Sequence, residues 1–518
     1  MAAIITEKFR LHNAEQFKES FTEASASNYY LFVGKSSPFT TTTKYSDTET
    51  TGGTDASPPN PHDRVIEENY KWDSMLAAKR ITSTDVMPVI PRRNYSQVTF
   101  DMYEHDITAT NPTTSGASNI YDSTFYFVTD EYKVYKVLDN NGGAIINDAN
   151  APTSTSSAPF FHGGYYLQYM YTLQTIDTIK FLTTDFVAVR NDATVTTDVT
   201  TASGDSAPFH GAPIQVVRVT NVGGSLPNGD YYTKVNGDGT GAIVKIKVAS
   251  SVIVRFGEAG TLMHAGGSGY TFGTIDLTKC YNNSGLSGTP VDLSANNAAV
   301  HPIISPRIGH GHDPVSELGG HYVMMNARLE QTESGDFTVA NDFREVGIVV
   351  DPHNAGTTTV SNVSQVRMTY ALKLESVSGD FEVDEKITQA STDATGRVVE
   401  WDATRSVLYY LQEQWENYGI SSDSSNSAYQ TKVLFSGANQ ITGAQSSATA
   451  TPKATADGTD DAAANNGDAT KASGLSFTDG YAVPELEHDS GNIIYVENRR
   501  PISRASDQTE DIKIVIEF

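Results

Sequence analysis

The sequence predicts a mainly β protein built from short strands and many turns. Tyrosine, at 26 residues, far outnumbers tryptophan, at 3, and the 41 glycines accompany abundant threonine, serine and asparagine, a composition typical of strands and turns. In the run from Ile512 to Phe518 the even positions are apolar while Lys513 and Glu517 are charged, which is the period of a half-buried strand. Turn signals such as Asn-Asn-Gly-Gly at 140–143 separate the apolar runs. We expect the final strand to hold the C-terminal residues in the core.

The N-terminal part of the chain carries the helical patterns. Asn13 followed by Gln16 matches a capping box, and apolar residues recur at helical spacing from there to Ala24. A strand is expected over 29–33, a loop over the Thr-, Ser- and Pro-rich residues 36–62, and a second helix over 66–79.

The remaining elements are expected to be strands. Prolines on either side of Val89 and Ile90 favour an extended pair. The apolar runs predict further strands at 98–103, 124–128, 132–138, 165–173, 186–189, 214–219, 242–248, 322–329 and 346–350.

Shifts in composition predict five segments. The core begins with residues 1–190, which include the N-terminal helices, and a Gly-, Asn-, Thr- and Val-rich β module is inserted at 191–309. Residues 310–371 return to the core. Residues 372–476 contain a second small β module and, from 436, a flexible Ala/Ser/Thr/Asp tract. Residues 477–518 contribute the C-terminal strands of the core.

Charge and cysteine content exclude several classes of protein. Lys and Arg total 36 against 62 acidic residues, a formal charge of −26, which argues against sequence-independent nucleic-acid binding and against an anionic membrane surface as partner. Cys280 is the one cysteine, so no intrachain disulfide forms. The sequence has no apolar run of membrane-spanning length and no signal-peptide pattern, so we expect a protein made in the cytosol.

The most metal-like cluster is His310-Gly311-His312-Asp313, with His321 nearby. Two imidazoles and a carboxylate could share an ion, but structural zinc requires four ligands and no cysteine is close in sequence. We therefore favour an ordered loop and expect no metal and no cofactor.

No pattern in the sequence predicts an enzyme. The glycine-rich residues 236–241 favour a hairpin turn over a phosphate or calcium loop, and residues 457–461 favour a solvated acidic loop. No nucleophile elbow is present. Acidic pairs lie at 384–385 and at 485 and 487, but only a cleft would make such pairs catalytic. Core packing is favoured over sugar stacking for all three tryptophans, which are Trp72, Trp401 and Trp415.

Two basic doublets stand beside prolines in this acidic chain. Arg92 and Arg93 follow Pro91, and Arg499 and Arg500 precede Pro501, with Arg504 close by. In one interpretation the guanidinium groups pair with carboxylates inside the protein and lock loops. In the other they belong to an interface with a neighbouring subunit, where arginine is enriched. Both interpretations stay open at the level of sequence.

Four motifs, scattered over the chain but in order, carry a resemblance to a known family. They are residues 3–10 (AIITEKFR), 89–95 (VIPRRNY), 341–348 (NDFREVGI) and the C-terminal pair 490–499 (SGNIIYVENR) and 507–510 (DQTE). Together they resemble the baseplate wedge family of T-even-like contractile-tailed phages, the family of the eighth gene product. The resemblance covers about 1–190, 310–370 and 477–518, and it leaves the inserted segments without a counterpart.

The resemblance implies a structural role without enzymatic activity. Its members are layered β-sandwiches with helices carried in loops, and they form homodimers that join other wedge proteins in the virion. The implied mechanism is mechanical, because subunit contacts hold the plate and rearrange when the sheath contracts. Two other classes remain as alternatives. One is a receptor-binding adhesin or fibre tip, which the glycine-rich inserts would suit, and the other is a polysaccharide depolymerase.

Overall fold

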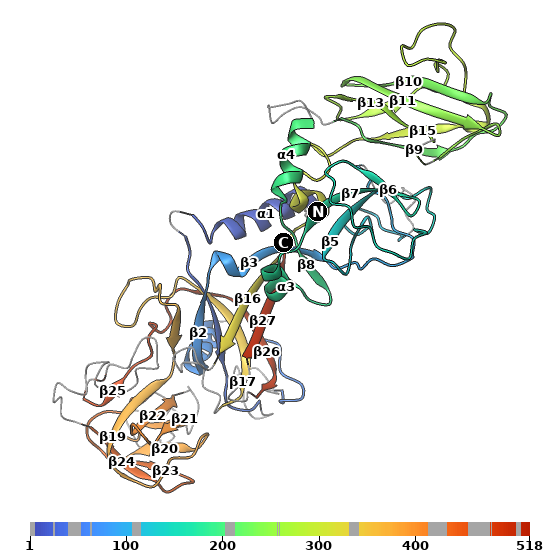
Figure 1. Ribbon diagram of the computed structural model, residues 1–518. Helices are drawn as coiled ribbons and strands as arrows, with labels where there is room; N and C mark the ends of the chain where they lie inside the picture. Colours follow the sequence, from blue (N-terminus) through green and yellow to red (C-terminus); the bar gives the residue numbers. More distant parts are fainter. Residues whose placement is uncertain are drawn as a thin grey trace. The chain divides into compact units, whose positions relative to one another are not determined.

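The computed structural model describes most of the chain. The described residues are 6–23, 26–39, 53–62, 65–105, 115–202, 213–255, 257, 260–330, 341–412, 432–453, 477, 479–503 and 509–518. They form two compact units, each assembled from segments that are far apart in sequence (Figure 1). Unit 1 comprises 1–17, 87–324 and 515–518, and unit 2 comprises 18–86 and 325–514.

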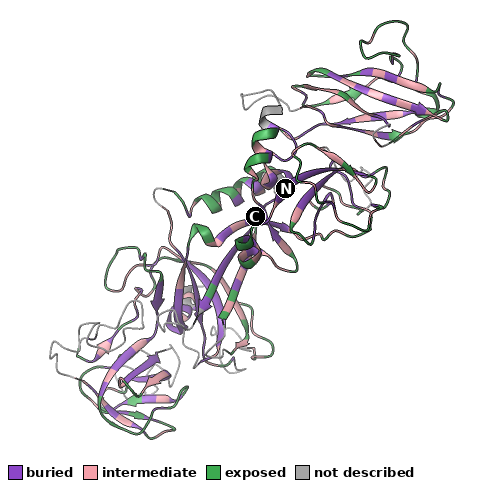
Figure 2. Ribbon diagram, viewed as in Figure 1, coloured by how far each residue is buried: buried purple, intermediate pink, exposed green. Residues whose placement is uncertain are grey.

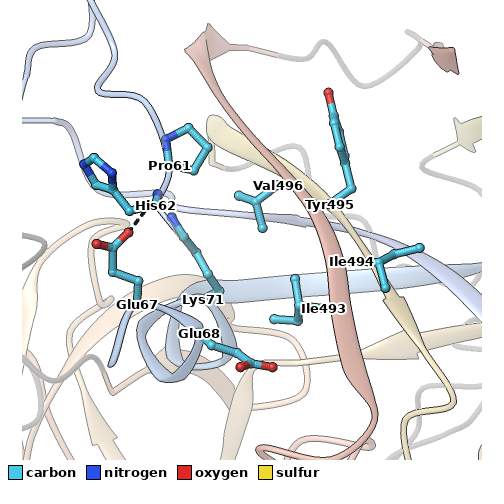
Figure 3. Close-up of a pocket in the computed structure, with 9 residues that line it drawn as sticks. All are labelled: Pro61, His62, Glu67, Glu68, Lys71, Ile493, Ile494, Tyr495 and Val496. Atoms are coloured by element: carbon cyan, nitrogen blue, oxygen red, sulfur yellow. Dashed lines mark hydrogen bonds between the residues drawn. The ribbon is translucent and has the colours of Figure 1, made fainter. Parts of the chain in front are cut away.

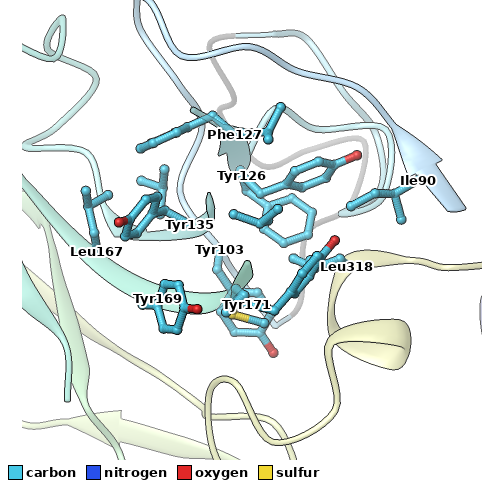
Figure 4. Close-up of a cluster of buried hydrophobic side chains, with 14 of the residues drawn as sticks. Ile90, Tyr103, Tyr126, Phe127, Tyr135, Leu167, Tyr169, Tyr171 and Leu318 are labelled. Atoms are coloured by element: carbon cyan, nitrogen blue, oxygen red, sulfur yellow. The ribbon is translucent and has the colours of Figure 1, made fainter. Parts of the chain in front are cut away.

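The aromatic core of unit 1 is built on a four-stranded antiparallel sheet. Its order is β4 (Tyr126–Val128), β5 (Lys133–Asp139), β7 (Tyr165–Thr172) and β6 (Phe160–His162). Most residues of β5 and β7 are buried on both faces (Figure 2). Figure 4 shows the resulting cluster, in which Tyr126, Phe127, Tyr135, Tyr169 and Tyr171 lie between Leu167 on one side and Leu318 on the other. The tyrosine-rich composition therefore fills a core here.

A second β module of unit 1 has a hydrophobic cluster of its own. Strand β9 (Val216–Asn221) pairs with β15 (Ala299–Ile303), and β10 (Gly229–Gly237) forms a hairpin with β11 (Thr240–Ala249). The sheet of β10 and β11 is completed by β12 (Val252–Ile253), β13 (Leu262–Ser268) and β14 (Gly273–Ile275), while β9 and β15 form a separate two-stranded sheet. A short 3-10 turn, η2 (Ala295–Asn297), precedes β15.

The main sheet of unit 2 has the order β18 (Gln365–Arg367), β2 (Met75–Ile81), β1 (Tyr29–Gly34), β17 (Phe343–Val350) and β26 (Asn492–Ile502). Helix α2 (Val65–Ser74) contributes Trp72 to a cluster with Tyr30, Phe32 and Val349 from these strands. The 3-10 turn η1 (Ser83–Asp85) follows β2. All of β1 and nearly all of β17 are buried, so these central strands lack the alternation of a sheet that has one face in solvent.

The second β assembly of unit 2 is a closed ring of strands. Its order is β22 (Val407–Leu411), β21 (Thr395–Asp402), β20 (Lys386–Gln389), β23 (Ile441–Gly443), β24 (Thr449–Pro452), β19 (Tyr370–Ser378) and β25 (Tyr481–Ala482). An additional pairing of β19 with β22 closes six of these strands on themselves. Closure leaves these six strands without free edges, which protects them from unwanted pairing.

A further four-stranded sheet has the order β27 (Thr509–Glu517), β16 (Tyr322–Glu330), β3 (Val86–Pro91) and β8 (Phe186–Ala188). The predicted C-terminal strand is therefore present as β27. Its burial is weaker than expected at the end, because Ile512 and Ile514 are buried whereas Ile516 and Phe518 are partly exposed. The ring of Phe518 lies 5.3 Å from that of Phe17.

The helices are few and short. They are α1 (Glu7–Glu19), α2, α3 (Thr175–Phe181), α4 (Ala193–Ala202) and α5 (Pro314–Leu318). Among the described residues, no helix combines the length and the apolar character that crossing a bilayer demands. The prediction of a mainly β fold with a few helices is confirmed. The predicted segment boundaries at 190, 309, 371 and 476 stay a prediction.

Several predicted elements are wrong. Helix α1 begins at Glu7 and places Asn13 inside it, because the carbonyl of Thr6 accepts the first helical amides, those of Phe9 and Arg10. The helix predicted over 66–79 ends at Ser74, because the following residues pair as β2 with strands on both sides, and such pairing outweighs a local helical pattern.

Two further corrections concern strands and loops. Residues 98–103 form no strand, since their amides are taken by other partners, for example Phe100 by the Tyr165 hydroxyl and Tyr103 by the Val137 carbonyl. The tract predicted as a loop from 436 contains β23 and β24. Its residues 454–476 lie outside the described part of the chain.

Candidate interaction site

Arg92 lies directly after β3 and fastens the end of that strand. Its Nε donates a hydrogen bond to Oδ1 of Asn94 at 2.8 Å, and its Nη1 donates to the carbonyl of Thr183 at 3.0 Å. Its backbone N–H donates to the carbonyl of Asp185 at 2.7 Å. The side chain and the backbone of Arg92 thus hold the segment that leads into β8.

Arg93 covers a buried tyrosine. Its guanidinium carbon lies 4.5 Å from the ring centroid of Tyr126, a cation–π distance, and its Nη2 lies 3.4 Å from the carbonyl oxygens of Tyr121 and Asp122. Burial raises the pKa of the Tyr126 hydroxyl, and the charge of Arg93 opposes that rise. The hydroxyl itself donates to the carbonyl of Pro91 at 2.8 Å.

The first arginine doublet therefore makes contacts inside unit 1, but with different partners from those expected. The internal interpretation assumed pairing with carboxylates, whereas Arg92 and Arg93 contact backbone carbonyls, an amide oxygen and an aromatic face. The turns at 121–122 and 183–185 present these carbonyls, and the sequence gives no direct sign of such backbone acceptors.

The second doublet is more exposed. Arg499 and Arg500 belong to β26, which is the terminal strand of its five-stranded sheet. The Nε of Arg499 lies 3.5 Å from Oε1 of Glu497, and both side chains are about half exposed, at 47% and 45%. Arg500 is also exposed. Arg504, the fifth candidate, lies outside the described residues.

The candidate metal cluster forms an ordered loop around one carboxylate. Glu317 accepts the backbone N–H of Gly311 at 2.8 Å and of Asp313 at 3.1 Å, and it accepts Nζ of Lys136 at 2.7 Å. Asp313 caps helix α5 by accepting the N–H of Ser316 at 3.3 Å. Of the groups proposed as ligands, the carboxylate of Asp313 therefore has a structural role at the start of α5.

His310 itself is fully buried, with its ring 5.1 Å from the ring of Tyr103 in an edge-on arrangement. Burial, with the nearby charge of Lys136, lowers the pKa of His310, so its ring is neutral. Neither ring nitrogen finds a hydrogen-bond partner in the described part of the chain. The described residues contain no group of three His, Cys, Asp or Glu side chains placed to hold a metal ion.

Two buried ion pairs were not predicted from the sequence. Lys136 and Glu317 are 0% and 3% exposed, and the ammonium of Lys136 lies 3.9 Å from the ring centroid of Tyr103. In unit 2, Lys71 of α2 pairs with Glu345 of β17, and both are buried. Each pair joins residues more than a hundred positions apart, so spacing along the chain could not reveal it. The one sign in the sequence of the first pair is Lys136 itself, because a lysine inside the apolar run 134–138 indicates a buried charge that needs a partner.

The acidic motifs hold turns. The hairpin predicted at 236–241 is confirmed, and Asp238 at its tip accepts the N–H of Thr271 at 2.9 Å and its hydroxyl at 2.5 Å, which lowers the pKa of Asp238 to about 2. Asp384 pairs with Arg397, and Glu385 accepts two backbone amides near Ser446. Residues 457–461 lie outside the described chain.

The carboxylates of Glu485 and Glu487 likewise accept backbone N–H groups, those of Arg367 and Gly356, each at 2.6 Å. Trp72 is buried in the core of unit 2, as predicted, and Trp401 is partly buried with its indole N–H on Asp380. Trp415 lies outside the described residues.

A cavity of about 350 Å³ lies beside β26 in unit 2 (Figure 3). Its walls are Pro61 and His62, three residues of α2, and residues 493–496 of β26. Two charged side chains there are engaged, since Glu67 accepts the N–H of His62 at 3.1 Å and Lys71 pairs with Glu345. The arrangement offers a recess next to a terminal strand.

One family model matches the chain in two segments. The family is described as Phage-Gp8: Bacteriophage T4, Gp8, and the match covers residues 3–159 and 458–518. The matched segments contain the motifs at 3–10, 89–95 and 490–510, whereas the motif at 341–348 lies outside them. Among curated proteins, none matches the sequence.

Proposed function

Because the chain belongs to the Bacteriophage T4 gp8 family over residues 3–159 and 458–518, we propose that it is a baseplate wedge subunit that holds neighbouring wedge proteins together. The family is one of structural proteins of the phage baseplate, which implies a place in the virion tail and association with other baseplate proteins. The match at both ends of the chain is the observation that carries the proposal.

The proposed action is mechanical. The subunit forms a homodimer, joins the wedge during assembly, and exchanges contacts when the plate rearranges and the contractile sheath is triggered. Such a change requires interfaces whose free energies differ between two arrangements.

Arg499 and Arg500 are the candidates for a contact with a neighbouring subunit. They are exposed on a terminal strand, and arginine is enriched at interfaces because its planar group can pair with carboxylates in a fork. Arg92 and Arg93 are less suited, because their guanidinium groups already contact carbonyls within unit 1.

The test is the double variant Arg499→Ala with Arg500→Ala. We expect it to fold normally, with stability within about 0.5 kcal/mol of wild type as for surface substitutions, and to enter phage tails poorly in a complementation assay. The control is Lys8→Ala with Lys234→Ala, which removes two exposed positive charges elsewhere. Normal incorporation of the arginine variant would rule out this contact.

A receptor-binding adhesin remains the second candidate. It is favoured by the inserted β module, which has its own hydrophobic cluster and exposes Phe272 to 59%. Light scattering on the purified chain separates the two functions, since a wedge subunit should be a dimer and an adhesin a trimer. The two also differ in glycan binding, which is expected of the adhesin and not of the wedge subunit.

A further inference from the structure

A second cavity, of about 310 Å³, lies in unit 1 between the aromatic sheet and the inserted β module. Asp139, Phe161 and Tyr166 come from β5, β6 and β7, respectively. Across from them lie Val216 of β9 and Met263 of β13, with Gln215 just before β9.

Two side chains of this cavity, Asp139 and Gln215, have hydrogen-bond acceptor oxygens with unused capacity. Asp139 accepts one backbone N–H, that of Asn141 at 2.7 Å. The Oε1 of Gln215 is buried and accepts no hydrogen bond from any residue that the structure describes. A buried acceptor without a donor is unfavourable, so the cavity suits a group that brings N–H donors.

The remaining walls suit a cation with an apolar stem. The rings of Phe161 and Tyr166 lie 4.7 Å apart at 35°, and Phe161 is 37% exposed, so aromatic surface faces the opening. Aromatic faces attract cations, and arginine in particular stacks on them. Val216 and Met263 provide apolar surface of the kind that covers the methylene stem of a long basic side chain.

We propose that this cavity receives an arginine side chain from a neighbouring baseplate protein, with the guanidinium at Asp139 and Gln215. Two acceptors beside an aromatic wall match the planar donor fork of arginine better than the single ammonium of lysine. The formal charge of −26 favours a basic partner. The inference rests on the proposed function only for the source of the arginine.

Two cations of the chain itself act on Asp139, and both have other partners. Arg218 forms an ion pair with Glu104, and Nη1 of Arg255 donates to the carbonyl of Val219 at 2.8 Å. Burial raises the pKa of Asp139 to about 7, against the opposing effects of the Asn141 N–H, Arg218 and Arg255. Because a guanidinium pairs with the ionised carboxylate, its affinity should fall about tenfold for each pH unit below this value.

The test titrates a probe, Nα-acetyl-L-arginine amide, into the full-length protein at pH 8 and measures binding by calorimetry. We expect binding of the probe, and about tenfold weaker binding of the citrulline analogue, whose neutral urea cannot make the charge-assisted hydrogen bond. The Asp139→Asn variant should lose binding by a similar factor. Asp130→Asn, a matched change at an exposed carboxylate, should bind as wild type does.

A second variant tests the inference independently, in case Asp139→Asn does not fold. Phe161→Ala removes a partly exposed ring, and it should weaken binding about threefold if the ring faces the cation. The inference is overturned if the arginine probe does not bind at millimolar concentration. It is also overturned if the citrulline or the lysine analogue binds as tightly as the arginine probe.

Incorporation into tails separates this inference from the proposed function. Asp139→Asn should enter tails poorly if a partner's arginine fills the cavity. If the variant loses the probe yet enters tails as wild type does, the cavity is no assembly contact and the inference fails while the structural function stands. If the isolated chain binds the probe but is absent from tails, the proposed function fails instead.

Discussion

At the scale of residues, the cores are stabilised by buried charges as well as by apolar contacts. Glu317 accepts hydrogen bonds from Lys136 and from two backbone amides of the 310–313 loop. All the partners of such a pair must be present, because removing one leaves a buried charge without compensation. This single carboxylate therefore orders the loop that the sequence suggested as a metal site.

Replacing Glu317 with Gln should lower the free energy of unfolding by about 3–5 kcal/mol, because Lys136 then remains buried without a counter-charge. Urea unfolding followed by circular dichroism measures the change. The matched control is Glu131→Gln, since Glu131 forms a pair with Lys133 but is 64% exposed, and it should change stability by less than about 1 kcal/mol. Equal effects of the two substitutions would contradict the account.

The contribution of Asp139 to folding stability changes with pH in the opposite direction from that of an ion-paired acid, whose pKa is lowered by folding. Its pKa in the folded protein is raised to about 7, above the value of about 3.9 in an unfolded chain. The folded state therefore binds more protons in this window, and the contribution of Asp139 to stability falls as pH rises from about 4 to about 7. Thermal melts of wild type and Asp139→Asn should diverge over this range, with the variant gaining relative stability toward pH 8. A constant difference would count against the raised pKa of Asp139.

Residue types alone predicted some of these sites. Trp72 was expected in the core and lies there, because an indole buries a large apolar surface. The internal contacts of Arg92 and Arg93 were anticipated as one alternative, but their partners are carbonyls that any residue could provide. Lys136 and Glu317 meet across 181 positions, and one sequence shows no sign of such a pairing.

At the level of helices and strands, pairing with other strands decides the structure of segments whose local pattern fits more than one kind of element. The strands around 29–33, 132–138, 165–173 and 346–350 were predicted, because each is apolar and rich in aromatic or β-branched residues. The segment after Ser74 has a helical pattern, yet it becomes β2 between β1 and β18. The closed ring of β19 to β24 depends on pairings between distant segments, which no local pattern contains.

Gly347 illustrates how closely the strands of unit 2 pack. A Cβ atom there would lie 2.2 Å from the Phe32 ring and 2.7 Å from the carbonyl of Tyr495 on β26. Gly347→Ala should lower the free energy of unfolding by about 1–3 kcal/mol, the usual cost of overpacking a core, as measured by urea unfolding. Gly285→Ala, a control whose nearest neighbour would be the end of the Asn283 side chain at 3.3 Å, should have little effect. A neutral Gly347→Ala would show that β17 can shift relative to β1.

At the scale of the whole molecule, each unit combines segments from both ends of the chain, and the family match covers those ends. The inserted β module of unit 1 is different, because one continuous stretch of sequence forms it. Its first and last strands pair, with Val216 opposite Ile303, so its ends lie next to each other. The composition shifts indicated an insertion and a core assembled from residues 1–190, 310–371 and 477–518, whereas the division of the chain into two units was not predicted.

Residues 213–305, expressed alone, should therefore fold as an independent domain. The segment has its own hydrophobic cluster, and neighbouring ends are typical of domains that can be inserted or removed. Dispersed amide signals in an NMR spectrum and a single cooperative melt are the expected results. A collapsed spectrum would show that the module depends on the aromatic sheet for its stability.

The most direct test of the central claim is a density map of intact phage tails at a resolution that traces the chain. We expect this chain within the baseplate, as a dimer, with Arg499 and Arg500 of β26 buried against a neighbouring subunit. Finding the chain outside the baseplate, for example at a fibre tip, would contradict it.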